Sequence, residues 1–203
     1  MKSLCKRAFD VLIALPAVVI LLPIFVVIFV AVKLTSRGPA IFRQERAGKD
    51  GRPFVFYKFR TMKVGVDPFG PSPKSRDDPR LTRVGKFLRA YSLDELPQVF
   101  NVLKGDMSIV GPRPLYISQM AEWDDQQRKR LLVKPGLTGL AQISGRAELT
   151  REEKLQLDLK YVETACLWLD IKIIFATIVQ VFGRKSIYEK RYSQSEYTRG
   201  QSK

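Results

Sequence analysis

Two adjacent acids, Asp94 and Glu95, are the residues best placed for chemistry, and two interpretations of them are open. They belong to the run Ser92-Leu93-Asp94-Glu95, which has the form S-x-x-E ahead of an apolar stretch. In the first interpretation Ser92 caps a helix and Glu95 reaches back to the Ser92 amide. In the second the acids form part of a site, because charged and rigid segments lie on both sides of them.

The strongest neighbouring signal is Arg113, which stands between Pro112 and Pro114. Proline fixes its own backbone and restricts the residue before it, so this arginine is held in a stiff segment. A guanidinium held in place binds phosphate oxygens well. The segment is therefore a candidate phosphate-binding site, although a surface turn would have the same composition.

Composition limits which side chains can catalyse and which partners fit. The 203 residues include 35 Lys and Arg, 20 Asp and Glu and no His, for a formal net charge of +15. Such an excess indicates a negatively charged partner: nucleic acid, anionic lipid or a phosphorylated substrate. Without histidine, any acid, base or nucleophile must be Asp, Glu, Lys, Tyr, Ser or Cys. Cys5 and Cys166 have no metal-ligand spacing, so packing is the simpler role for both.

An unbroken apolar run covers residues 11–32. As a helix it would be about 33 Å long at about 1.5 Å per residue, enough to cross a bilayer core. It is too long for the apolar core of a cleavable signal peptide. Pro16 and Pro23 lie inside it, and Pro23 should kink the helix near its middle.

Basic residues flank the apolar run on both sides, and cytoplasmic flanks of membrane helices are enriched in Lys and Arg. A re-entrant helix that enters, bends at Pro23 and returns to the same face would satisfy both flanks, whereas a straight span would not. Hydropathy alone favours the span. The flanking residues are Lys2, Lys6 and Arg7 before the run, and Lys33, Arg37, Arg43 and Arg46 after it.

A second apolar segment, residues 167–182, carries Asp170 and Lys172 and is too polar to span comfortably. It is either a buried core helix or an amphipathic helix in the headgroup plane, with Trp168 as an interfacial anchor.

The soluble part is expected to be α+β: a small, mostly helical domain with one β-hairpin. Strand-forming residues between 40 and 61 surround a Gly-Lys-Asp-Gly turn and predict the hairpin. Residues 63–79 hold four prolines and two glycines, which indicates either a lid or a surface loop. Helical patterns cover residues 82–90, 93–104, 116–132 and 151–162.

Five segments in this order and spacing resemble the bacterial sugar transferases, also called monotopic phosphoglycosyl transferases. The similarity runs through nearly the whole chain to about Phe182, and includes the Pro-broken apolar helix. The segments are YKFRTM (57–62), SLDELPQ (92–98), NVLKGDMS (101–108), VGPRP (110–114) and KPGLTGLAQISGR (134–146).

The resemblance implies a role for each candidate residue. Asp94 would be the nucleophile and Glu95 would help to hold Mg²⁺, which takes carboxylate and phosphate oxygens. The implied phosphate contacts are Lys58, Arg89, Arg113 and Arg146.

The resemblance also implies the reaction: a phosphosugar moves from a UDP-sugar donor to a polyprenol phosphate acceptor, with release of UMP, to start a polysaccharide or glycoprotein glycan. The expected architecture is a re-entrant membrane segment at 1–33, a catalytic domain at 34–183 with an interfacial helix at 167–182, and a polar tail at 184–203. The site would face the cytoplasm at the bacterial inner membrane, in contact with membrane lipid. A homodimer is left open.

Two departures from the family pattern leave sugar contacts undecided, because the family often has Trp at the position of Leu140 and Asn at the position of Ser144.

One competing function and one competing mechanism also remain. One is a membrane-tethered basic module that binds anionic lipid or nucleic acid without catalysis, although no nucleic-acid motif is evident. The other is direct attack of the acceptor on the donor in a ternary complex.

Overall fold

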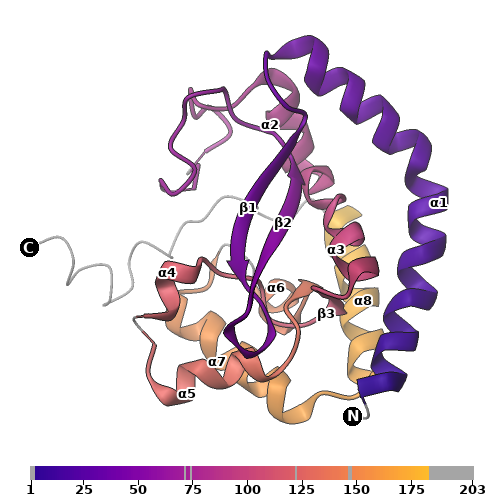
Figure 1. Ribbon diagram of the computed structural model, residues 1–203, viewed down its shortest axis with the longest axis vertical. Coiled ribbons are helices and arrows are strands. Elements are labelled where there is room, and N and C mark those ends of the chain that lie inside the picture. The colour runs from indigo at the N-terminus through magenta and orange to yellow at the C-terminus, as the bar shows by residue number, and fades with distance from the viewer. Residues whose placement is uncertain (1–2, 71, 74, 122, 146–147, 183–203) are drawn as a thin grey trace, which may run out of the picture.

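The computed structural model describes residues 3–182 except 71, 74, 122, 146 and 147, so the predicted polar tail at 184–203 lies outside the described residues. The fold is α+β, as predicted, with a long N-terminal helix wrapped along one side of a small domain (Figure 1). In chain order the elements are α1 (Ser3–Thr35), β1 (Ile41–Ala47), η1 (Lys49–Gly51), β2 (Pro53–Phe59), α2 (Arg83–Ala90), η2 (Leu93–Glu95), α3 (Gln98–Lys104), β3 (Ser108–Val110), α4 (Ile117–Met120), α5 (Asp125–Arg128), η3 (Lys129–Leu132), β4 (Gly136–Thr138), α6 (Leu140–Ser144), α7 (Arg151–Thr164) and α8 (Leu167–Phe182).

The predicted hairpin is present and forms the centre of the domain. Strands β1 and β2 pair antiparallel, with Ile41 opposite Phe59 and Phe42 opposite Lys58. Because side chains alternate along a strand, Tyr57 and Phe59 lie on the face turned toward α1 and α3, and Lys58 lies on the other. The hairpin therefore has one face turned toward α1 and α3 and an opposite face that carries Lys58.

A second, two-stranded sheet was not predicted. Strands β3 and β4 pair in parallel, with Ser108 opposite Gly136. Their backbones approach so closely that a Cβ on Gly136 would lie 2.1 Å from the Gly111 nitrogen, and one on Gly111 would lie 2.4 Å from the Lys134 carbonyl oxygen. The glycines of the VGPRP and KPGLTG segments thus permit backbone contact directly before Arg113.

Two of the four predicted helices keep their limits within two residues, and two are corrected. The helix predicted at 93–104 is broken into η2 and α3, because Pro97 interrupts the backbone ladder between them. The helix predicted at 116–132 is divided into α4, α5 and η3, with Asp124 capping the start of α5. Residues 63–79 form no helix or strand wherever the structure describes them, as expected of a loop.

Helix α1 is the one described helix that is long and apolar enough to cross a membrane, with a mean hydropathy of 3.2 in its most apolar stretch. Pro16 and Pro23 both lie within it, and Figure 1 shows the helix bending around the domain. Only 17% of its most apolar window is buried. Most of its apolar side chains therefore face away from the protein.

Both ends of α1 are bound to the same domain. At its start, the Arg7 guanidinium donates to the carbonyl oxygens of Val102 and Leu103 at the end of α3. At its end, the Arg60 guanidinium donates to the carbonyl oxygens of Ser36 and Arg37, at 2.8 and 2.5 Å. Hydrogen bonds at both ends of α1 thus fix the helix to the domain.

A buried polar network holds the first turns of α1 as well. The Asp10 carboxylate accepts from the Ser108 hydroxyl at 3.0 Å and from the Ile109 amide at 3.1 Å. Lys6 bridges Asp10 at 2.7 Å and Asp170 of α8 at 3.0 Å. Since an unpaired buried charge is costly, these contacts fix the relative positions of α1, β3 and α8.

Helix α8 has the predicted limits and presents two different faces. Asp170 and Ile173 are fully buried in the domain, whereas Trp168, Phe175 and Val179 are mainly exposed. The buried face agrees with a core helix, and the exposed apolar face is the one that an interfacial position would explain.

Candidate active site

The acid pair forms η2, a short turn between α2 and α3. The capping interpretation of Ser92 is wrong: Ser92 has a left-handed backbone, with φ of 56°, and its side chain makes no capping hydrogen bond. A non-glycine residue with positive φ stores strain, and such residues concentrate at functional sites. The turn leaves Asp94 buried, with 7% of its surface exposed, and Glu95 partly exposed.

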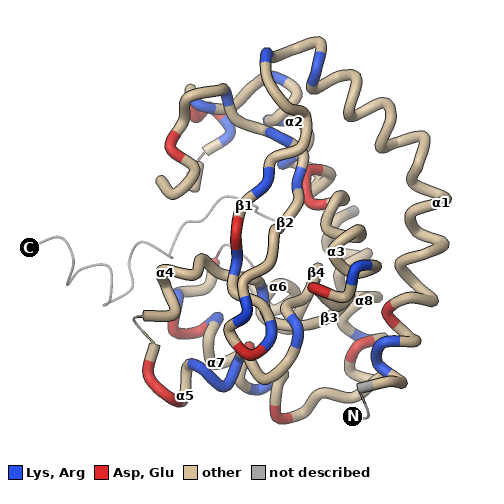
Figure 2. The backbone as a smooth tube through the Cα atoms, in the orientation of Figure 1, with Lys and Arg blue, Asp and Glu red and all other residues tan. Residues whose placement is uncertain are grey.

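Three predicted cations converge on the acids from three different elements. Lys58 comes from β2, Arg89 from the last turn of α2, and Arg113 from the segment after β3, and each interacts electrostatically with Asp94. The Arg113 guanidinium also forms an ion pair of 2.7 Å with the Glu95 carboxylate. Figure 2 shows basic residues along the hairpin, close to an acidic stretch just before α3. The fourth predicted cation, Arg146, lies outside the described residues.

Burial shifts the pKa values of Asp94 and Lys58, in each case toward the uncharged form. Desolvation raises the pKa of Asp94, and the neighbouring Glu95 carboxylate raises it further, against the opposing effects of Arg89, Lys58 and Arg113. Desolvation lowers the pKa of Lys58 to about 8, despite the nearby Asp94. Perturbed groups that share a cluster are typical of active sites.

A pH profile tests the role of Lys58. If its ammonium binds substrate phosphate, kcat/KM for the donor should fall as the pH rises above about 8, where the free enzyme loses this charge. In Lys58→Arg the fall should move to higher pH, because arginine stays protonated. Identical alkaline limbs in the two proteins would show that Lys58 is not the group that titrates.

Arg113 is held in place by residues that the sequence analysis missed. The guanidinium of Arg130 donates to the Arg113 carbonyl oxygen at 2.9 Å and forms an ion pair of 2.5 Å with Asp158 of α7. Both Arg130 and Asp158 are buried. Arg130 therefore links Asp158 of α7 to the backbone of the phosphate-binding segment, a contact called the Arg130 strut below. No spacing in the sequence links residues 130 and 158, so no local signal could have found this pair.

Arg46 of β1 was also missed as a site residue. Its guanidinium lies 3.6 Å from the centre of the Tyr116 ring and donates to the Gln44 side chain at 2.8 Å. Gln44 in turn donates to the Pro68 carbonyl oxygen at 3.1 Å. Arg46 also interacts electrostatically with Glu95 and Arg113, and burial lowers its pKa. This chain of contacts links the 63–79 loop to the acid pair, and strand alternation, which puts residues 42, 44 and 46 on the Lys58 face, could have indicated it.

The acid pair fits a metal that is shared with substrate better than a metal held by protein alone. Among the residues that the structure describes, no three His, Cys, Asp or Glu side chains gather into a metal site. Mg²⁺ commonly binds one or two carboxylates together with substrate phosphates. Glu95, which is partly exposed beside the buried Asp94, has the oxygen ligands that such an ion needs.

Comparison with known proteins bears on what such a site does. The family profile described as Bacterial sugar transferase matches residues 1–184. A Klebsiella pneumoniae protein named UDP-glucose:undecaprenyl-phosphate glucose-1-phosphate transferase is 46% identical over 191 residues, covering 90% of this chain and 41% of the relative. A Salmonella typhimurium protein named undecaprenyl-phosphate galactose phosphotransferase is 39% identical over 198 residues, covering 90% and 41%. The chain thus spans about two fifths of these relatives. It is also 41% identical to a Bacillus subtilis protein named uncharacterized sugar transferase EpsL, over 94% of each protein.

Proposed function

Since the chain belongs to the bacterial sugar transferase family, we propose that it moves a phosphosugar from a UDP-sugar to polyprenol phosphate and releases UMP. The observation that carries the proposal is the buried Asp94 carboxylate, which is surrounded by cations from three elements. It lies in the same domain that binds both ends of α1. Bulk water would solvate an exposed carboxylate and screen its charge, whereas a buried carboxylate among cations lies where a phosphate group can also be bound.

The reaction proceeds in two displacements. First, an Asp94 oxygen attacks the β-phosphorus of the donor, forming an acyl phosphate. The bond from that phosphorus to the bridging oxygen breaks, and UMP leaves with the electron pair. Second, a phosphate oxygen of polyprenol phosphate attacks the same phosphorus, and Asp94 departs as a carboxylate. Neither step requires a proton transfer, which suits a chain without histidine.

The surrounding residues neutralise phosphate charge. Lys58, Arg89 and Arg113 bind the diphosphate, with Arg146 as a further proposed contact. Glu95 would help to hold Mg²⁺, which supplies charge neutralisation to the phosphate oxygens when bound. Arg113 pairs with Glu95 at 2.7 Å, so the two side chains lie together in the site.

The way α1 is held supports a proposal for how the protein sits at the membrane. We propose that α1 is re-entrant and that α8 lies in the interface, with the site at the cytoplasmic face of the bacterial inner membrane. The contacts of Arg7 and Arg60 support this arrangement, because a helix that spans the bilayer would have to give up the contacts at one of its two ends.

Cysteine labelling tests the re-entrant arrangement. Cys5 near the start of α1 and a cysteine introduced by Arg37→Cys after its end should both react with a membrane-impermeant maleimide in inside-out vesicles and stay unmodified in right-side-out vesicles. Each cysteine is tested alone, with Cys166→Ser in the background. Labelling of one end in each orientation would show a spanning helix instead.

Turnover tests the proposed function. Purified protein is incubated with polyprenol phosphate, Mg²⁺ and a panel of UDP-sugars, and UMP is measured. The proposal expects repeated turnover, measured as UMP release, to depend on donor, acceptor and Mg²⁺, with about one UMP per protein molecule when the acceptor is left out. Salt-sensitive binding of anionic lipid or nucleic acid, without UMP release from any donor, would instead establish a non-catalytic binding module.

A further inference from the structure

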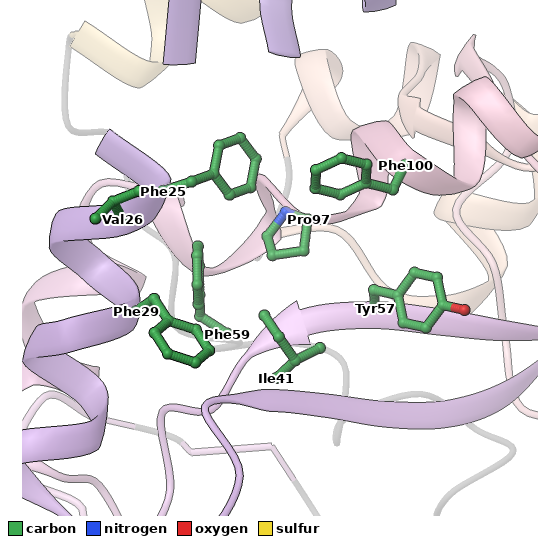
Figure 3. Close-up of a pocket in the computed structure, with 8 residues that line it drawn as sticks. All are labelled: Phe25, Val26, Phe29, Ile41, Tyr57, Phe59, Pro97 and Phe100. Carbon is green, nitrogen blue, oxygen red and sulfur yellow. The ribbon is translucent and has the colours of Figure 1, made fainter. Parts of the chain in front are cut away.

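An apolar pocket of about 330 Å³ lies on the face of the hairpin opposite Lys58 (Figure 3). One wall comes from α1, which contributes Phe25, Val26 and Phe29 just after Pro23. A volume near 330 Å³ is within the range of about 300 to 1,000 Å³ that is usual for small-molecule sites. Neither the phosphoryl chemistry nor the packing of the core uses this space.

The opposite wall of the pocket belongs to the elements that carry the active site. Tyr57 and Phe59 line the pocket on either side of Lys58 in β2, while Lys58 itself lies on the other face and interacts electrostatically with Asp94. Pro97, which also lines the pocket, is three residues after Asp94. The pocket and the acid pair are therefore built on the same strand and on neighbouring residues of the segment that joins η2 to α3.

The lining excludes most polar ligands. Every lining side chain is apolar except Tyr57, whose hydroxyl is directed away from the phenylalanines in Figure 3. Phe25 lies in the centre of the aromatic cluster, with its ring 5.8 Å from that of Phe59 and 5.4 Å from that of Phe100. A sugar or a nucleobase would lose its hydrogen bonds here without replacement. A hydrocarbon chain would lose nothing.

The pocket is open on the side of the exposed apolar surface of α1. Val26, Phe29 and Phe100 line it while remaining 56%, 45% and 39% exposed. A hydrocarbon chain can therefore enter from the exposed apolar surface of α1 and reach the wall formed by Tyr57, Phe59 and Pro97 without crossing a polar layer.

We propose that this pocket holds the isoprenoid chain of the acceptor next to its phosphate, so that the lipid is bound by its first isoprene units as well as by its headgroup. This inference rests on the proposed function, because it needs polyprenol phosphate as the acceptor. It assigns α1 a second role, as one wall of a substrate site in addition to a membrane anchor. Phe25 and Phe29, which follow Pro23 in α1, form this wall.

Val26→Trp tests the pocket, with Val27→Trp as its matched control. Val26 lines the pocket, whereas Val27, 67% exposed, does not, so both variants add the same bulk to α1 and only one fills the pocket. Val26→Trp is expected to raise KM for a long-chain polyprenyl phosphate about tenfold or more, a size typical of steric discrimination in apolar pockets. KM for the UDP-sugar should stay within twofold in both variants, which also reports that the fold and the acid pair are intact.

The outcomes separate this inference from the proposed function. Unchanged acceptor KM in Val26→Trp, with normal UMP release, overturns the pocket assignment and leaves the reaction standing. Equal increases in both variants overturn it too, because they would reflect altered membrane packing of α1. Absence of UMP release from the unaltered protein with any donor would overturn the proposed function, and the inference with it.

Discussion

Asp94→Asn is expected to lower turnover by at least about a thousandfold. Asparagine keeps the shape of the side chain but cannot form the acyl phosphate, so the first displacement has no nucleophile. Substrate binding should change much less, because Lys58, Arg89 and Arg113 remain. The measurement is UMP release, with donor affinity determined separately by equilibrium binding.

The fold should survive this substitution. Burial raises the pKa of Asp94, so the ionised carboxylate costs the folded state stability at neutral pH, where the unfolded chain carries it at no such cost. An uncharged amide removes that cost, and the thermal midpoint should hold or rise. Asp125→Asn, at an exposed acid in α5, is the matched control and should keep full activity. An active Asp94→Asn would disprove the nucleophile assignment.

Asp158→Ala is expected to cost about 3 to 5 kcal/mol in the free energy of unfolding. Arg130 and Asp158 are both at least 94% buried as side chains and pair at 2.5 Å, so the alanine variant leaves a buried guanidinium without its carboxylate. Because Arg130 also supports the Arg113 carbonyl, the folded fraction should bind the donor more weakly. Chemical unfolding in detergent, together with donor KM, measures both effects.

Two further variants serve as controls for the stability effect of Asp158→Ala. Asp158→Asn keeps an acceptor for Arg130 and should lose clearly less stability than the alanine variant. Lys104→Ala removes the more exposed ion pair with Asp106 and should change stability by no more than about 1 kcal/mol. If Asp158→Ala is no more destabilising than Lys104→Ala, the strut contributes little and Arg113 is positioned by its prolines and the glycine contacts.

Elements with a local signal were predicted well. The hairpin followed from strand-forming residues around a turn, and α8 has the predicted limits because its apolar run has clear ends. Helix α7 begins where Thr150 and Glu153 form a capping box, so the start at Arg151 was visible in the sequence. In each case the physical cause lies within a few residues of the element.

Features that depend on distant contacts could not be predicted. A capping box and the left-handed Ser92 share the same S-x-x-E pattern, and packing of η2 against α2 and β2 decides between them. The parallel pairing of β3 with β4 joins three-residue strands that are too short to give a periodic signal. The Arg130 strut depends on α7 returning to the site.

The candidate site shows the same division. Family motifs identified Asp94, Glu95, Lys58, Arg89 and Arg113, and the fold brings these five together. Arg46 was seen only as a flanking charge of the membrane segment, although the hairpin carries it into the cluster. A basic residue close to an apolar run can be either a membrane-flanking charge or a site residue, and only the strand register distinguishes these two roles.

A covalent adduct on Asp94 is the most direct test of the central claim. The protein is mixed with UDP-sugar and Mg²⁺ without acceptor, quenched, digested and analysed by mass spectrometry. The account predicts the mass of one phosphosugar on the peptide that contains Asp94, lost again when polyprenol phosphate is added before quenching and absent in Asp94→Asn. Normal turnover with the acceptor, combined with no adduct on Asp94 in its absence, would contradict the account and favour direct transfer in a ternary complex.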